Sequence, residues 1–230
     1  LTGSKNALKG AGFFIGAVLL SWLEFQGAIA VMVAMLSMVW LMSLLLLRQE
    51  LGVMKAKPKF SQIFSKSEAV NRLSLARFFL FGARDVWFVV ALPVFLHEVL
   101  GWDFWQVGGY LAAWVMIYGM IQAAAPKLTG RSQAPDVVGR QLVVFGGCLA
   151  LTPAAIGVAL SYGLSPVFVV TVGLLIFALL FAMNSALHSF LIVRFARDEG
   201  ASLDIGFYYM ANAGGRLAGT VGSGALYQWM

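Results

Sequence analysis

Among the charged residues in or beside the long apolar segments of the sequence, five cations and one carboxylate are candidates for binding or chemistry. Arg84 and Asp85 are adjacent near the middle of one such segment, which also contains Arg77, and Arg216 lies in another. A charged side chain at the centre of a bilayer costs about 2.5–3.5 kcal/mol on insertion scales, so it faces a protein interior or a water-filled cavity. We therefore predict that the helices with these residues line a substrate path.

The charge balance of this predicted path favours an anionic substrate. Asp85 is the one carboxylate among the candidates, and the cations are Lys5, Lys9, Arg77, Arg84 and Arg216. Guanidinium groups suit oxyanions because their planar fork makes two parallel hydrogen bonds to a phosphate-like or carboxylate group. We expect Arg84, Arg216, Arg77 and Lys9 to hold a small organic anion.

The adjacent positions of Arg84 and Asp85 predict that each has a partner elsewhere. Neighbouring residues of a helix point about 100° apart, so we expect these two side chains not to pair simply with each other. Arg77 and Arg84 are seven residues apart and share a helix face. The alternative to ligand binding is a buried salt bridge between helices. Asp85 is also a candidate for carrying a coupling proton.

A polar stripe runs along the last apolar segment. Tyr208, Asn212 and Arg216 are spaced four residues apart and so lie on one helix face, where Tyr208 and Asn212 would orient the anion. Gly215 and Gly219 form a GxxxG pattern, which favours close packing of two membrane helices.

A further polar face combines Asn184 and His188, which are four residues apart with Ser185 beside them. It fits a binding face in which Asn184 orients the substrate, or a proton relay through His188. It equally fits hydrogen bonds that only hold the helices together. Tyr118 and Gln122 form a similar polar pair in another segment.

The place of Lys5 and Lys9 depends on where the first helix begins. If it begins upstream of residue 1, Lys9 lies well inside the membrane. If it begins near Leu8, the long side chains of both lysines reach the cytoplasmic surface. Both interpretations stay open.

The composition requires membrane helices to carry these residues. The chain has 230 residues, 60% of them hydrophobic and 11% charged, with a mean hydropathy of +0.85. A soluble domain of this length cannot bury so much apolar surface, and the apolar runs are too long for barrel strands. Crossing a bilayer takes about 20 residues. Seven candidate spans are read against this requirement: 8–23, whose start before or after Lys5 stays open, 28–47, 74–96, 104–125, 140–160, 166–193 and 205–230.

Basic residues are confined to one side of the predicted spans. The turns around 24–27, 97–103 and 161–165 contain no Lys or Arg. The N-terminal residues and the loops 48–72, 127–140 and 194–204 contain many of them. By the positive-inside rule these loops are cytoplasmic.

The long hydrophilic connection 49–72 divides the chain into residues 1–48 and 73–230. Its basic and apolar residues fit either an amphipathic helix on the cytoplasmic face or a flexible linker. Because the chain lacks an initiator methionine and stops where a span ends, we expect a fragment of a longer protein.

Motifs of enzymes and metal sites are absent from the sequence. His97 and Glu98 lack the second histidine of a zinc-protease motif, no Walker A loop or GxSxG occurs, and Cys148 is the one cysteine. We expect no enzyme activity, no cofactor and no metal site. The net charge of +6 is distributed over loops, as topology requires, so we expect a lipid bilayer and no nucleic acid as partner.

The arrangement of two spans, a basic loop and five further spans resembles helices five to eleven of a twelve-helix major facilitator superfamily transporter. The resemblance implies an all-α integral membrane bundle. Residues 1–48 would be the last two helices of the N-terminal bundle, 49–72 the cytoplasmic central loop, and 73–230 the first five helices of the C-terminal bundle. It also implies alternating access about a midplane site, with proton antiport as the expected coupling.

Four segments resemble the organoarsenical-efflux permeases of bacterial arsenic-resistance operons: LTGSKNALKGAGFF, ARFFLFGARDVWFVVALPVFL, GWDFWQVGGYLAAWV and GFYYMANAGGRLAGTVGSGALYQW. This resemblance implies efflux of 1-arseno-3-phosphoglycerate across a bacterial inner membrane. A partner glyceraldehyde-3-phosphate dehydrogenase would make that compound from arsenate. The compound is a small polyanion, which agrees with the separate count of cations.

Two other functions stay open. The first is an exporter of another sugar phosphate, organic anion or drug. Pairing of Arg84 and Arg216 with carboxylates in the expected missing helices would indicate a substrate with little negative charge. The second is a receptor or assembly protein that moves nothing, which predicts arginines in fixed ion pairs with no cavity beside them.

Overall fold

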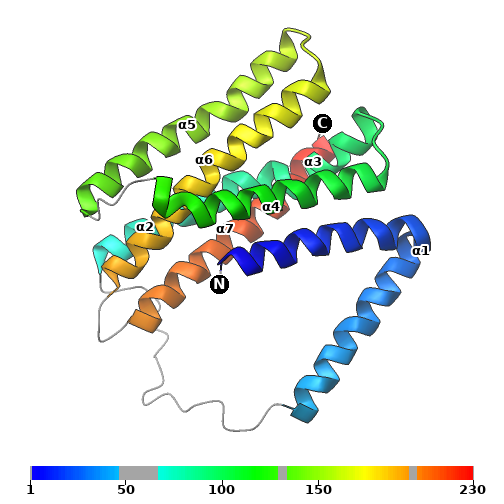
Figure 1. The fold of residues 1–230 in the computed structure, drawn as a ribbon, viewed down its shortest axis with the longest axis horizontal. Coiled ribbons are helices and arrows are strands. Elements are labelled where there is room, and N and C mark those ends of the chain that lie inside the picture. The colour runs from blue at the N-terminus through cyan, green and yellow to red at the C-terminus, as the bar shows by residue number, and fades with distance from the viewer. Residues whose placement is uncertain (1, 47–66, 129–133, 197–200, 230) are drawn as a thin grey trace.

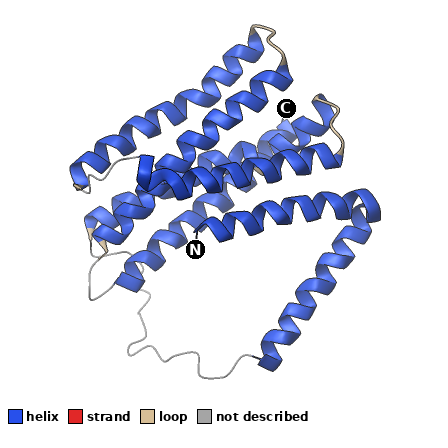
Figure 2. Ribbon diagram, viewed as in Figure 1, coloured by secondary structure: helices blue, strands red, loops and turns tan. Residues whose placement is uncertain are grey.

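The protein was analysed as a computed structural model that describes residues 2–46, 67–128, 134–196 and 201–229. None of the residues in these ranges forms a strand, and the regular elements are helices (Figure 2). The all-α membrane fold class is thereby confirmed. The elements in chain order are α1 (Thr2–Leu46), α2 (Glu68–Phe88), α3 (Ala91–Val94), the short π-helix η2 (Phe95–Val99), α4 (Phe104–Leu128), α5 (Pro135–Ser161), α6 (Pro166–Phe195) and α7 (Ala201–Trp229).

The two predicted N-terminal spans form one element with a sharp break at Glu24. This residue has φ 55° and ψ −176°, a conformation that interrupts the helical hydrogen bonds. The second arm of α1 therefore turns back from the first (Figure 1). Within the described residues, five helical stretches are long and apolar enough to cross a membrane, with α1 counted once and with α2, α3 and η2 counted together as one. The polar, glycine-rich α7 is not among these five, so its role as a span stays a prediction.

The predicted span 74–96 is divided into α2, α3 and η2 instead of forming one helix. Pro93 explains the break, because its ring blocks the carbonyl of Val89, four residues earlier, and it has no N–H to donate. The freed N–H of Ala91 donates to Ser223 Oγ of α7 at 3.2 Å. A neighbouring helix thus satisfies the backbone at the break.

The boundary between α5 and α6 lies at the predicted turn. Gly163 has φ +74°, a left-handed conformation that glycine adopts without strain, and Pro166 begins α6. At its other end, α5 begins at Pro135, earlier than the predicted 140, because proline is favoured in the first turn of a helix.

The helices α2 and α7 pack against each other through glycines (Figure 1). A Cβ at Gly215 would lie 2.1 Å from the Phe78 carbonyl oxygen, and one at Gly219 would lie 2.4 Å from that of Gly82. The two backbones are therefore in contact. This confirms the close packing predicted from the GxxxG pattern.

A second close contact joins α1 to α4. A Cβ at Gly108 would lie 2.2 Å from Ala17 Cβ, and one at Gly10 would lie 2.8 Å from Met116 Cγ. Small residues thus place the first arm of α1 directly beside α4.

An aromatic core joins α2, α4 and α6. The ring centroids of Phe81 and Phe181 are 5.1 Å apart, and those of Phe88 and Trp114 are 4.6 Å apart. Trp114 Nε1 donates to the carbonyl oxygen of Leu174 at 2.7 Å, which fixes the indole. This core supports the polar side chains described next.

Candidate functional site

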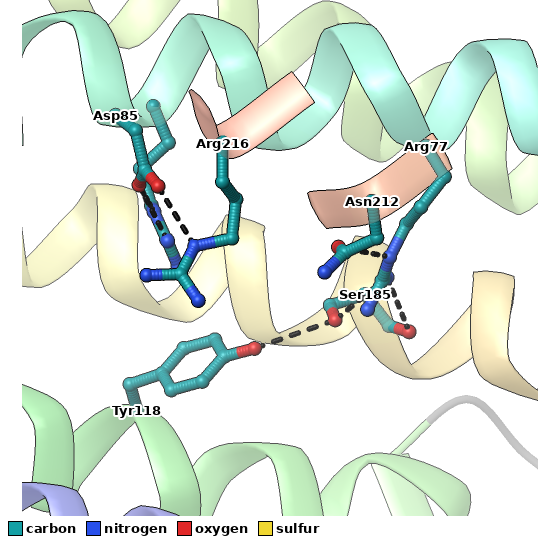
Figure 3. A network of polar contacts seen from close by, with 7 residues as sticks. Arg77, Asp85, Tyr118, Ser185, Asn212 and Arg216 are labelled. Carbon is teal, nitrogen blue, oxygen red and sulfur yellow. Dashed lines mark hydrogen bonds and ion pairs between the residues drawn. The ribbon is translucent and has the colours of Figure 1, made fainter. Parts of the chain in front are cut away.

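Asp85 of α2 is bound by two arginines, Arg84 and Arg216, and its contact with Arg216 is drawn in Figure 3. Its Oδ1 accepts from Arg84 Nε at 2.6 Å and is 2.5 Å from Arg84 Nη2. Its Oδ2 accepts from Arg216 Nε of α7 at 2.9 Å. Each carboxylate oxygen is therefore held by a different guanidinium, and the side chain is fully buried at 0% exposure.

The expectation that Arg84 and Asp85 do not pair with each other is wrong. The angle of about 100° describes the directions in which adjacent side chains leave the helix. It does not limit the far end of a long arginine side chain, which here folds back to the neighbouring carboxylate. The expected partner on another helix also exists for Asp85, because Arg216 approaches it from α7.

Arg84 and Arg216 differ in side-chain exposure and in which of their nitrogens bind Asp85. The side chain of Arg84 is 12% exposed and lies over the rings of Phe81 and Phe181, with its central carbon 4.7 and 5.1 Å from their centroids. The side chain of Arg216 is 46% exposed and uses only Nε to bind Asp85. Among the described residues, the two terminal nitrogens of Arg216 have no partner, so they can bind a ligand.

A cavity of about 750 Å³ lies beside this group and is lined by Arg84 and Arg216. Its walls come from the first arm of α1, from α2, α3 and η2, from α4, and from α7 through Arg216. Most of the lining is apolar, with Phe88 and Trp114 among the side chains. The arginines therefore place positive charge at the wall of a largely apolar space.

A second polar group surrounds Arg77, which is 6% exposed. Its Nε donates to Asn212 Oδ1 at 3.1 Å, and its Nη1 donates to Ser185 Oγ at 3.0 Å (Figure 3). Its guanidinium lies 4.1 Å from the centroid of Phe81 and 5.2 Å from that of Tyr208. Within the described part of the chain, no carboxylate lies within ion-pair distance of it. Arg77 is thus a buried cation held by neutral groups.

The polar stripe predicted on α7 contributes residues to both polar groups, the one around Arg77 and the one around Asp85. Tyr208 and Asn212 lie at Arg77, whereas Arg216 lies at Asp85. Phe81 connects the groups, because the guanidiniums of Arg77 and Arg84 both lie over its ring.

Two predicted residues of α6 have different surroundings. Asn184 Nδ2 donates to the carbonyl oxygen of Leu142 at 3.3 Å, so its amide contacts α5 and not the arginines. His188 is buried at 2% exposure, and its Nδ1 has no hydrogen-bond partner among the residues that the structure describes.

Lys5 and Lys9 belong to α1, but their side chains lie outside the described residues, so their predicted role stays a prediction. No group of three or more His, Cys, Asp or Glu that could hold a metal ion is found in the described ranges.

Sequence reasoning missed a contact between α4 and α6. The Tyr118 hydroxyl lies 3.3 Å from Ser185 Oγ, and Gln122 Nε2 donates to the same atom at 3.2 Å. The spacing of Tyr118 and Gln122 marked a shared face, but nothing in the sequence showed that this face meets Ser185. Tyr118 also lines the cavity.

A family model described as Major Facilitator Superfamily matches residues 3–220. The chain belongs to the major facilitator superfamily. No curated protein and no solved structure matches it. Its apolar helices and its family make this facilitator a multi-pass membrane transporter, and the predicted superfamily resemblance is confirmed.

Proposed function

We propose that this facilitator exports a small organic oxyanion by alternating access, with 1-arseno-3-phosphoglycerate as its cargo. One observation carries the proposal: Asp85 is held by Arg84 and Arg216 at the wall of a cavity. The Asp85 carboxylate is itself an oxyanion, so these guanidiniums already have the geometry that an oxyanion requires.

The cargo would bind to the groups of the two arginines that Asp85 does not occupy. The terminal nitrogens of Arg216 offer hydrogen-bond donors, and Arg84 adds a second positive charge. Lys9 precedes Gly12 and Phe13 of the cavity wall by about one helical turn, and we propose that it contributes charge there. Arg77, with Tyr208 and Asn212, supports the site from behind Phe81.

Asp85 is our first candidate for proton coupling. A protonated carboxyl group cannot hold two guanidiniums as strongly as a carboxylate does. Protonation would therefore change how strongly Asp85 holds Arg84 and Arg216 at the cavity wall. His188 is the second candidate, because it is buried on α6.

The proposed location and the proposed partner enzyme follow from the resemblance to organoarsenical permeases. The transporter would lie in a bacterial inner membrane, with loops 48–72, 127–140 and 194–204 in the cytoplasm. A glyceraldehyde-3-phosphate dehydrogenase in the same cell would supply the cargo.

The decisive experiment measures arsenic retained by arsenic-sensitive cells after exposure to arsenate. The transporter, at its full length, is expressed with and without the dehydrogenase, as wild type, as Arg84→Gln and as Arg72→Gln. Arg72 is a matched control because it lies on the same helix with its side chain 78% exposed. We expect dehydrogenase-dependent loss of arsenic in the wild type and in Arg72→Gln, and retention in Arg84→Gln.

The other outcomes separate cargo from site. If cells with Arg84→Gln still lose arsenic, the proposed cargo is supported and Arg84 is not needed to bind it. If cells with folded wild-type protein retain arsenic in every condition, the proposed arsenical cargo is wrong.

The apolar lining of the cavity favours a second candidate, an exporter of an amphipathic organic anion or drug. Phe88, Leu111 and Trp114 would contact the apolar part of such a molecule. Export of a hydrophobic carboxylate dye that depends on Arg84, without any effect on arsenic, would support this function. A receptor that moves nothing would need no cavity beside its ion pairs, whereas the pair of Asp85 and Arg216 borders one.

A further inference from the structure

Tyr118 of α4 is one of the residues that line the cavity, and its hydroxyl points toward Ser185 (Figure 3). The ring stacks on Trp114 with centroids 5.8 Å apart and planes 3° apart. Its hydroxyl lies 3.3 Å from Ser185 Oγ. Because packing fixes the ring, what Tyr118 offers to the cavity depends on which of the two hydroxyls donates to the other.

Two other groups at Ser185 decide this direction. Arg77 Nη1 lies 3.0 Å from Ser185 Oγ, and Gln122 Nε2 lies 3.2 Å from it. A guanidinium and an amide nitrogen can only donate, and a hydroxyl oxygen has two lone pairs. Arg77 and Gln122 therefore occupy both acceptor positions of Ser185. Ser185 can bond to Tyr118 only by donating its own proton.

We propose that Tyr118 accepts this proton and uses its own O–H to donate to the substrate in the cavity. Ser185, Arg77 and Gln122 are then positioning residues, which act through Tyr118. This inference rests on the proposed function, because the expected acceptor is an oxygen of the anion bound by Arg84 and Arg216. It assigns Arg77 a role behind the cavity wall, in agreement with its burial and with its absence from the described lining.

The direction of this hydrogen-bond chain also strengthens Tyr118 as a donor. Successive hydrogen bonds polarise one another in an interior of low dielectric constant. Here the chain begins at the Arg77 cation and ends at the Tyr118 hydroxyl. An anionic oxygen is the acceptor that gains most from a polarised O–H, so the geometry favours an oxyanion over a neutral acceptor.

The first test needs no ligand. Infrared spectra of the purified full-length transporter, labelled on the tyrosine ring carbons, are recorded for wild type and Tyr118→Phe, and their difference isolates the carbon–oxygen stretching band of Tyr118. A phenol that accepts and a phenol that donates shift this band in opposite directions. We expect an accepting phenol in wild type, and loss of that signature in Ser185→Ala. The band of a phenol that donates to Ser185 would overturn the proposal.

The second test measures binding of 3-phosphoglycerate, a stable probe with a phosphate and a carboxylate, by calorimetry on the same protein in nanodiscs. Removing a hydrogen bond to a charged group weakens binding by about tenfold or more, so we expect that loss in Tyr118→Phe. Tyr110→Phe is the control, because Tyr110 lies on the same helix outside the cavity lining. Its affinity should equal that of wild type.

A double variant tests whether Ser185 acts on the substrate only through Tyr118 or affects binding through the protein structure in general. If Ser185 acts through Tyr118, Tyr118→Phe with Ser185→Ala loses no more affinity than Tyr118→Phe alone. Losses that add would overturn the positioning role. Unchanged affinity in Tyr118→Phe, combined with loss in Arg84→Gln, would overturn this inference and leave the proposed function. If the wild type binds no probe, the proposed cargo class fails, and the infrared band still decides the direction of donation.

Discussion

Asp85 Oδ2 accepts a hydrogen bond from Arg216 Nε at 2.9 Å, and this contact joins α2 to α7 at the wall of the cavity. The same carboxylate binds Arg84 on its own helix. Three charges thus meet between two helices, and under the proposed function both the stability of the bundle and the affinity for an anion would depend on this contact.

Replacing Asp85 with asparagine should destabilise the empty transporter and strengthen anion binding. Removing one partner of a buried ion pair costs about 3–5 kcal/mol, because the other charge stays buried without compensation. We expect a lower melting temperature for Asp85→Asn, and a larger rise on addition of 3-phosphoglycerate than in wild type. Asp136→Asn, at the exposed start of α5, is the control. Equal melting temperatures for Asp85→Asn and wild type, with and without the probe, would contradict the role of Asp85.

Gly219→Ala should separate α2 from α7. The new methyl group would lie 2.4 Å from the Gly82 carbonyl oxygen and 3.0 Å from Asp85 Cβ, so the helix backbones must move apart. Overpacking of this kind costs about 1–3 kcal/mol, and we expect thermal unfolding at a lower temperature together with loss of transport. Gly224→Ala is the matched control on α7, since a Cβ there meets nothing within 4 Å. If both variants behave alike, the close packing at Gly219 is not needed.

The contact between α1 and α4 can be tested with two adjacent glycines. Gly108→Ala would bring its methyl group 2.2 Å from Ala17 Cβ, whereas a Cβ at Gly109 meets nothing within 4 Å. We expect Gly108→Ala to lower the melting temperature and Gly109→Ala to leave it unchanged. Adding Ala17→Gly removes the obstructing methyl group and should restore part of the loss. No restoration in the double variant would point to the Phe13 carbonyl oxygen, 3.3 Å away, as the obstacle.

Ser223→Ala should loosen the break between α2 and α3. The variant leaves the Ala91 N–H without the hydroxyl that accepts from it at 3.2 Å. The half-buried Ala91 N–H then has no acceptor in place of the lost hydroxyl, so we expect faster hydrogen exchange at the Ala91 amide. Ser161→Ala, at the exposed end of α5, should leave that amide unchanged. Unaltered hydrogen exchange at Ala91 in Ser223→Ala would mean that another group accepts a hydrogen bond from the Ala91 N–H.

The topology can be checked by labelling single cysteines from outside the cell. After Cys148→Ser, we expect Tyr162→Cys, in the exposed turn after α5, to react with an impermeant maleimide in intact cells. Arg140→Cys, near the other end of α5, should react only after the membrane is permeabilised. The reverse pattern would invert the predicted orientation.

Much of the fold could be predicted from apolar length and from the turn residues. Pro166 and Gly163 mark the turn between α5 and α6, and the GxxxG pattern anticipates the contact of α7 with α2. The breaks inside elements could be anticipated only in part. A proline is a local signal of a helix break, as at Pro93, and the predicted turn around 24–27 contains the break at Glu24. The sequence did not show that the conformation of a single residue makes this second break.

By itself, the sequence determined that the chain is a helical membrane protein and that Arg77, Arg84, Asp85 and Arg216 are costly to bury. Both conclusions follow from hydrophobicity and charge along the chain, which need no contacts. Only the tertiary structure decided that Asp85 binds both Arg84 and Arg216, and that Arg77 binds Ser185 and Asn212. Helical periodicity states which face a residue is on, whereas the reach of a long side chain and the packing of helices decide which atoms meet.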